Sequence, residues 1–452
     1  MTSRRPLSKL AFAWAPAALL AMIAACGPRT EPYATTSNPE PDEFATSVPL
    51  GTTAYSHDSL AVLLADLTLV TEWGDKIDIL NRYEPPISVG IVGGGYDTYL
   101  PFLDNLLADL TKNTGIQIRR SEAPHDLLIR FVPGPDWTPL QDNQCIIING
   151  QPDLATFLNS EENYAKPVLT KSGRMRQSVF IPNTNTPNEI RECLIEETLQ
   201  ALGPANDIYG LGATIFNDDD AHSWPTRMDY LMLRVLYDPE MPAKAARTDM
   251  IDAARKILRR VNPEGNGAPD LPPHRQEEFM AWRGRIHQMN RLLRDEFEDH
   301  AAAKGLAEVI VEEAEEKAPL SAYHCEAVTN AGWMLRQSND ADAMAVLETA
   351  RTICATAHGD QDIRIAKLRQ QQALLALDEK QYAESLRRSA GLVEIFKAHG
   401  QDDEVATTYA LRWAAMSWLD HPDRDKTHDQ ALRWSAYAFG NDNEIVQEWR
   451  GY

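Results

Sequence analysis

Four side chains whose oxygen atoms could act as ligands lie close together near the middle of this 452-residue chain. They take relative positions 0, 1, 4 and 10, with a glycine at position 7: Glu196, Glu197, Gln200, Asn206 and Gly203. Residues four apart lie on one face of a helix, so the first glutamate and the glutamine should point the same way. The second glutamate lies about 100° round the helix. The pattern predicts a helix that presents carboxylate and amide oxygens together, a set that could hold a cation or activate water.

This spacing is similar to the zinc-binding motif of metzincin proteases, which place His, Glu, His, Gly and His at the same five positions. The glutamate of that motif falls at Glu197 and the glycine at Gly203, whereas all three histidines are replaced. In a zinc protease neutral imidazoles hold Zn²⁺ and the glutamate activates its water. The resemblance implies Glu197 as the catalytic residue and Glu196, Gln200 and Asn206 as the metal ligands. Such oxygen donors suit Ca²⁺ or Mn²⁺ better than Zn²⁺.

Three interpretations of this helix stay open. Its polar side chains could form a buried hydrogen-bond network that fixes the loop carrying Asn217, they could bind a hard cation, or Glu197 could serve in hydrolysis. Aspartates 218–220 and His222 follow in the loop and could add ligands, although aspartate runs are usually solvated. We favour the network and expect no cofactor, with a divalent cation, Ca²⁺ or Mn²⁺ before Zn²⁺, as the alternative.

Three stretches around this helix resemble an uncharacterised bacterial family, the domain of unknown function 2927, whose members are mostly exported. These stretches are residues 196–203, 215–220 and 231–239, and the similarity covers about residues 50–245. The family is similar in layout to zincin metallopeptidases with an altered catalytic helix. The resemblance therefore implies a zincin-like α+β domain, in which Phe216 stands where the Met-turn methionine usually lies.

The first residues resemble the signal peptide of a bacterial lipoprotein. Two arginines and a lysine precede an apolar stretch, 10–25, that is short for a membrane span. It ends in Ile-Ala-Ala directly before Cys26, whose thiol is expected to carry the lipid, including palmitate. Gly27 follows instead of aspartate, which favours the periplasmic face of the outer membrane. We therefore expect an exported protein held at the cell envelope by a lipid on Cys26.

The charge of the chain limits its ligands. It has 66 acidic and 44 basic residues, a formal net charge of −22. A charge of this sign argues against nucleic acid, and against anionic lipid as the main ligand of the folded part. The lipid on Cys26, and not a basic surface, is therefore the expected contact with the membrane.

Four further cysteines are expected to form disulfides, because an even number in an exported protein favours pairing. They are Cys145, Cys193, Cys325 and Cys354, and no CxxC spacing among them points to zinc. Pairing within each region predicts Cys145–Cys193 and Cys325–Cys354. In the chain-entropy model each bond stabilises the protein by roughly 3.5–4 kcal/mol.

The first half of the chain alternates short β-rich runs with amphipathic segments. Strands are expected at the following residues: 86–92, 116–119, 127–132, 145–148 and 177–182. Helices are expected at 60–67, at 100–112 and from about residue 187, where the glutamates lie. This order predicts helices packed on a mixed sheet, with the polar helix last.

From about residue 276 the chain shows only amphipathic helical patterns, and these patterns repeat. An Ala-His-Gly segment at 357–362 returns at 398–403. Residues 381–386 resemble the start of the second helix of a tetratricopeptide repeat, although the spacing of the patterns exceeds the roughly 34 residues usual for that repeat. We expect a tetratricopeptide-like array of about three hairpins, with an ordinary helical bundle as the alternative.

The predicted fold is an α+β zincin-like domain followed by an all-α tetratricopeptide-like array. The expected boundaries are a signal peptide at 1–25, a disordered tether at 26–48, the zincin-like domain at 49–260, a linker at 261–275 and the helical repeats at 276–452. We expect a lipid-anchored envelope protein with a non-catalytic zincin-like domain and an array that binds a protein or peptide. The alternative is a divergent metal-dependent peptidase or hydrolase that uses Glu197.

Overall fold

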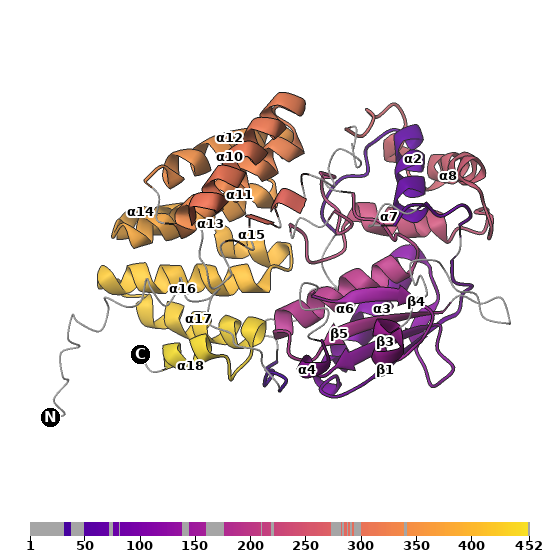
Figure 1. Ribbon diagram of the computed structural model, residues 1–452, viewed down its shortest axis with the longest axis horizontal. Coiled ribbons are helices and arrows are strands. Elements are labelled where there is room, and N and C mark those ends of the chain that lie inside the picture. The colour runs from indigo at the N-terminus through magenta and orange to yellow at the C-terminus, as the bar shows by residue number, and fades with distance from the viewer. Residues whose placement is uncertain are drawn as a thin grey trace. The chain divides into compact units, whose positions relative to one another are not determined.

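The computed structural model of this chain forms two compact units, residues 28–277 and 278–452 (Figure 1). It describes residues 31–37, 49–71, 76–80, 82–137, 144–159, 176–208, 210–217, 221–272, 282, 284–286, 288–289, 292, 300–338 and 341–450. Cys26 and the apolar stretch before it lie outside these residues. Within them, no helix combines the length and the apolar character needed to cross a membrane.

The first unit is built on a five-stranded sheet in the order β2-β1-β3-β5-β4. The strands are β1 (Ile87–Val92), β2 (Ile118–Arg120), β3 (Leu127–Val132), β4 (Ile146–Asn149) and β5 (Gln177–Pro182). Four of them pair in parallel, and β4 alone runs antiparallel, against β5. Because parallel strands bury both faces, β3 and β5 are apolar over most of their length.

The two faces of the sheet support two separate apolar clusters. Leu127 and Ile129 of β3, with Val179 and Ile181 of β5, point into the large core, whereas Val132 of β3 and Phe180 of β5 form a small cluster with Trp137 and Ile148. Helix α3 (Leu100–Thr114) supplies four buried leucines to the large core and ends at Gly115, whose φ of 81° few other residues adopt. The short helices α4 (Gly134–Trp137) and α5 (Leu154–Leu158) lie beside the small cluster.

Four longer helices complete the first unit. Helix α6 (Pro187–Ala201) packs on β5, β4 and α3, and α7 (Arg227–Leu236) also packs on α3. Helix α2 (His57–Thr68) packs against α8 (Arg247–Val261), and α7 contacts α8 as well. All four supply buried side chains to the one large core, so the polar helix α6 is fixed on several sides.

Residues 261–272, which we expected as part of a linker, are held against the start of the first unit. The side chain of Asn262 donates to the carbonyl oxygen of Thr53 (2.9 Å), and its own carbonyl accepts from the imidazole of His57 (2.8 Å). The backbone N–H of Ser56 donates to the carbonyl of Pro269 (2.8 Å). A short 3₁₀ helix, η6 (Pro263–Gly265), lies between these contacts. A second 3₁₀ helix, η4 (Asp97–Tyr99), directly precedes α3.

Every element described in the second unit is a helix. The helices are α10 (His300–Lys317), α11 (Ala322–Gln337), α12 (Ala343–His358), α13 (Ile363–Asp378), α14 (Tyr382–Arg388), α15 (Leu392–Ala398), α16 (Asp402–Trp418), α17 (Arg424–Phe439) and α18 (Glu444–Arg450). Each packs on the next along most of the series. The expectation of a mixed α/β unit followed by an all-helical unit is confirmed.

The turns of this unit recur at a regular spacing. Gly359, Gly400 and Gly440 each follow a helix with a positive φ, and the two intervals between them are almost equal in length. Lys380 and Asp420 take positive φ after α13 and α16, and the same interval separates them. The spacing divides the chain into three hairpins, α11–α12, α13 with α14 and α15, and α16–α17. The interval seen between similar sequence segments is therefore a structural repeat as well.

Candidate functional site

Helix α6, which carries Glu196 and Glu197, is capped at its start by two reciprocal hydrogen bonds. At its start the hydroxyl of Thr186 accepts from the N–H of Glu189 (3.3 Å), and the Glu189 carboxylate accepts from the N–H of Thr186 (2.6 Å). This reciprocal capping box satisfies two backbone donors that the first turn leaves free. The helix therefore begins at Pro187, as expected from the sequence.

The predicted disulfide between Cys145 and Cys193 is present, with a Cα–Cα distance of 6.0 Å. Cys193 lies in the middle of α6, and Cys145 directly precedes β4. The bond therefore joins the helix to the antiparallel edge strand and limits movement of α6 along the sheet. Cys325 and Cys354 are also paired, and they join α11 to α12.

One face of α6 carries a line of polar side chains. Glu192, Glu196 and Gln200 are four residues apart, and the hydroxyl of Ser223 donates to the Glu192 carboxylate (2.6 Å). Glu196 is half-buried, whereas Glu197 is only 6% exposed. The structure thus places the candidate catalytic carboxylate toward the interior, next to the polar line.

Gly203, the glycine of the motif, follows the helix at a position where no side chain fits. Gly203 has a φ of 136°, and a Cβ atom at this position would lie 2.5 Å from a methyl carbon of Leu236. Both the backbone conformation and the contact with α7 therefore require glycine. Gly203 therefore turns the chain after α6.

Beyond the turn, the two predicted amide ligands hold the chain in place. The Gln200 amide nitrogen donates to both carboxylate oxygens of Asp207, at 3.2 Å each, and both side chains are buried. The Asn206 amide nitrogen donates to the carbonyl of Asp66 near the end of α2 (2.9 Å). These bonds tie the segment after α6 to α6 itself and to α2.

The loop that follows is closed by a second set of buried hydrogen bonds. The N–H of Ile208 donates to the carbonyl of Phe216 (2.9 Å), and the Asn217 amide donates to the carbonyls of Leu211 (3.1 Å) and Gly212 (3.2 Å). Phe216, where the resemblance placed the Met-turn residue, is completely buried. Aspartates 218–220 lie outside the described residues, and His222 is half-buried.

Asp229 fixes the same loop from the start of α7. Its carboxylate accepts hydrogen bonds from the hydroxyl of Thr214 and from the N–H groups of Thr226 (2.7 Å) and Ile215 (3.3 Å). Burial raises the pKa of Asp229 to about 6, although these hydrogen bonds act in the opposite direction. Thr226 and Asp229 also form the capping box of α7.

Sequence reasoning missed Asp207 and Asp229, the two buried carboxylates that accept most of these bonds. The second had a readable signal, since Thr226-x-x-Asp229 has the spacing of a capping box. The first had none, because its partner lies across a turn whose geometry depends on Gly203. In the part of the chain that is described, no three His, Cys, Asp or Glu side chains group as a metal site would require. The ligand set of Glu196, Gln200 and Asn206 stays a prediction.

Comparison with known families supports the resemblance noted from the motifs. Residues 58–252 match a family described as "Protein of unknown function (DUF2927)". The match begins in α2 and ends in α8, and so it includes the sheet, α6 and the loop closed by Asp229. No curated protein matches the chain.

Proposed function

We propose that this chain is a lipid-anchored protein of the bacterial cell envelope, in which a zincin-like domain without catalytic activity accompanies a tetratricopeptide-like array that binds a protein partner. The observation that carries the non-catalytic part is the pairing of Gln200 with Asp207. In a working zincin the residue at this position gives a nitrogen lone pair to the metal. Here the position holds an amide whose nitrogen lies between two carboxylate oxygens as a donor.

The second amide supports the same proposal. Asn206 is fully buried, and its nitrogen is used to hold the end of α2. Both amide nitrogens thus serve as hydrogen-bond donors, which tie the segment after α6 to α6 itself and to the end of α2. Gln200 and Asn206 therefore act in a hydrogen-bond network that shapes the segment after Gly203.

The regular recurrence of the turns supports the array. Three successive hairpins with equivalent turns bury their apolar faces on one another, as solenoid repeats do, and such arrays mostly bind peptides or proteins. The outward side chains of this unit include Trp418 and Leu320, which are 38% and 53% exposed. Both positions are therefore accessible to a partner of the helical unit.

Metal analysis and protease assays test the first part of the proposal. We expect less than stoichiometric zinc in the purified chain by elemental mass spectrometry, and no cleavage of casein or of a peptide library. One zinc per chain, together with a turnover that Glu197→Gln abolishes while the protein stays folded, would establish the metal-dependent hydrolase instead.

Photo-crosslinking in cells tests the second part. A photoreactive phenylalanine analogue at Trp418 or Leu320, in the helical unit, should give a crosslinked product of higher mass. The same analogue at Val92 or Ile79, which are 38% and 47% exposed in the first unit, serves as the matched control. Products from the control positions alone would locate the partner on the first unit and contradict the proposal.

A further inference from the structure

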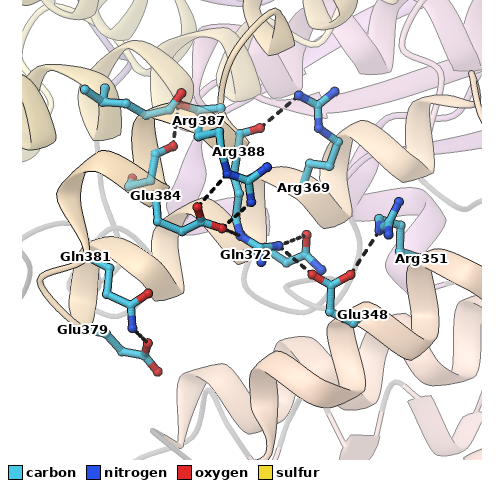
Figure 2. A network of polar contacts seen from close by, with 12 residues as sticks. Glu348, Arg351, Arg369, Gln372, Glu379, Gln381, Glu384, Arg387 and Arg388 are labelled. Carbon is cyan, nitrogen blue, oxygen red and sulfur yellow. Dashed lines mark hydrogen bonds and ion pairs between the residues drawn. The ribbon is translucent and has the colours of Figure 1, made fainter.

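A group of arginines gathers on three successive helices of the second unit, although the chain as a whole is strongly acidic. The arginine cluster consists of Arg351 on α12, Arg369 on α13, and Arg387 and Arg388 on α14. Figure 2 shows these side chains with the carboxylates and amides that surround them. Most basic residues of an acidic protein are neutralised by neighbours, so the balance within the cluster is informative.

Two carboxylates neutralise part of the cluster. Arg388 lies between Glu384 (2.7 Å) and Glu348 (2.8 Å), as Figure 2 shows, and also donates to the side-chain amide oxygen of Gln372 (2.7 Å). Arg387 forms two bonds to Glu384, and Arg351 forms one to Glu348 (3.2 Å). Arg388 is therefore structural, whereas Arg351 and Arg387 share carboxylates that it already occupies.

Arg369 has no carboxylate partner among the described residues. Its Nη2 donates to the carbonyl oxygens of Arg388 (3.0 Å) and Ala390 (2.7 Å), where the chain leaves α14. Partial burial lowers the pKa of Arg369, and the positive charges of Arg351 and Arg387 lower it further. The side chain is thus held close to like charges, and its Nε and Nη1 donors are not used within the described part of the chain.

The local charge is consequently positive. Four arginines contribute four positive charges, against three negative charges from Glu348, Glu384 and Glu379, the last of which accepts a hydrogen bond from the neutral amide of Gln381 (2.7 Å). The bonds from Arg369 Nη2 to the carbonyls at the end of α14 cap that helix, and Arg388 bridges Glu384 and Glu348. These contacts account for the positions of Arg369 and Arg388. They do not explain why Arg351 and Arg387, which are 48% and 67% exposed, stand beside an uncompensated guanidinium.

We propose that the arginine cluster binds the carboxylates of an acidic polypeptide segment. This inference rests on the proposed function, since it names the chemistry of the partner that the helical array takes. An arginine fork matches a carboxylate with two parallel hydrogen bonds, and Arg387 already binds Glu384 in this way through Nε and Nη2. A segment laid across α12, α13 and α14 would supply carboxylates to Arg351, Arg369 and Arg387 in turn.

A peptide fits these observations better than an anionic membrane surface. Charges act over about 8 Å at physiological salt, so a short bound segment is governed by the local positive charge. A flat anionic membrane interacts with the charge over a much larger area of the protein. Because the chain carries a net charge of −22, such a surface is repelled.

Fluorescence anisotropy with the complete mature chain in mild detergent tests the proposal. The probe is a fluorescein-labelled octaglutamate peptide, and an octaglutamine peptide of the same length is the control probe. We expect saturable binding of octaglutamate alone, weakened by raising NaCl from about 50 to about 300 mM. Equal binding of both peptides, or binding that salt does not weaken, would overturn the proposal.

Arginine variants locate the binding. Arg351→Gln and Arg387→Gln should each weaken octaglutamate binding about two- to fivefold, and the double variant about tenfold. The matched control is Arg424→Gln on α17, whose exposed side chain pairs with Asp420 and Asp425. An affinity unchanged in the double variant, or reduced equally by the control, would contradict the assignment.

Arg369 needs a separate check, because its loss also removes bonds to the end of α14. Arg369→Lys retains the charge, and Arg369→Gln removes it, so only the second should weaken binding if both melt at the same temperature. Binding to phosphatidylglycerol vesicles without binding to octaglutamate would also overturn the proposal. Failure here, with crosslinked partners still obtained from Trp418 or Leu320, would leave the proposed function standing and remove only the acidic segment.

Discussion

At the scale of single residues, the motif helix is best explained by its hydrogen-bond donors. Gln200 and Asn206 both use their amide nitrogens, and the acceptors are a buried carboxylate and a backbone carbonyl. A zinc site would use lone pairs at the same positions. Replacing histidine by an amide therefore keeps the geometry of the helix and its turn while changing what the side chains can bind.

Gln200→Ala is expected to lower the free energy of unfolding by about 1–3 kcal/mol, because the buried carboxylate of Asp207 would lose the two hydrogen bonds from the Gln200 amide. Gln200→Glu should cost more at pH 7 than at pH 5, since it places two carboxylates together. Urea unfolding of each variant measures the effect. The control is Gln117→Ala, which changes an exposed glutamine of the same unit and should stay within about 0.5 kcal/mol of wild type.

Asp229 should make stability depend on pH in a defined direction. Its pKa is raised to about 6 in the folded chain, above the value of about 3.9 expected when unfolded. Between about pH 4 and pH 6 the folded state therefore binds more protons, and stability falls as pH rises, by at most about 1.4 kcal/mol per pH unit. Above about pH 6 this contribution is constant.

Comparison with Asp229→Asn isolates this contribution from other carboxylates. The stability of wild type minus that of the variant, from urea unfolding at pH 4.5, 5.5 and 7.0, should decrease at each step up in pH. A difference that grows with pH would mean that the hydrogen bonds from Thr214, Thr226 and Ile215 outweigh burial.

At the scale of elements, local patterns predicted most of what formed. All five strands lie at or within two residues of the β-rich runs that predicted them, and helix α6 begins at the residue expected from the sequence. The strand order did not follow from the sequence, because the pairing of β3 with β5 joins segments far apart along the chain and depends on packing. The Gln200–Asp207 pair joins residues only seven apart, but it depends on the geometry of the turn at Gly203, which local patterns do not give.

The second helix of the middle hairpin departs from a simple repeat. It is divided into α14 and α15 by Gly391, which has a φ of 75°. The carbonyls at the break accept hydrogen bonds from Arg369 of α13 and Arg412 of α16. Arginines on neighbouring helices give no local signal at the break, so it could not be predicted from repeat spacing.

The two disulfides should protect different elements. Removing Cys145–Cys193 by double alanine replacement is expected to cost about 4 kcal/mol in the chain-entropy model, and removing Cys325–Cys354 slightly less, because its loop is shorter. Hydrogen exchange measured by mass spectrometry should rise in α6 and β4 for the first variant, and in α11 and α12 for the second. Increased exchange throughout both units in either variant would show that the bonds do not act locally.

At the scale of the whole molecule, the proposed function gives each of the two units a separate role. A mixed α/β unit with an internal hydrogen-bond network offers rigidity, and a helical array offers area for a partner. In the proposed arrangement the residues before the first unit connect both to a lipid. Attachment would then hold the arginine cluster near the envelope without using its charge for membrane contact.

Cys26→Ser tests that attachment. The cysteine follows Ile-Ala-Ala at the end of an apolar stretch that two arginines and a lysine precede. Each buried methylene of an acyl chain contributes about 0.8 kcal/mol to membrane binding, and more than one chain is needed for stable anchoring. The variant should therefore move to the soluble fraction and lose labelling by radioactive palmitate. A double variant of Cys325 and Cys354 should keep the label, which would place it on Cys26; wild type that stays with membranes unlabelled would exclude lipidation as the anchor.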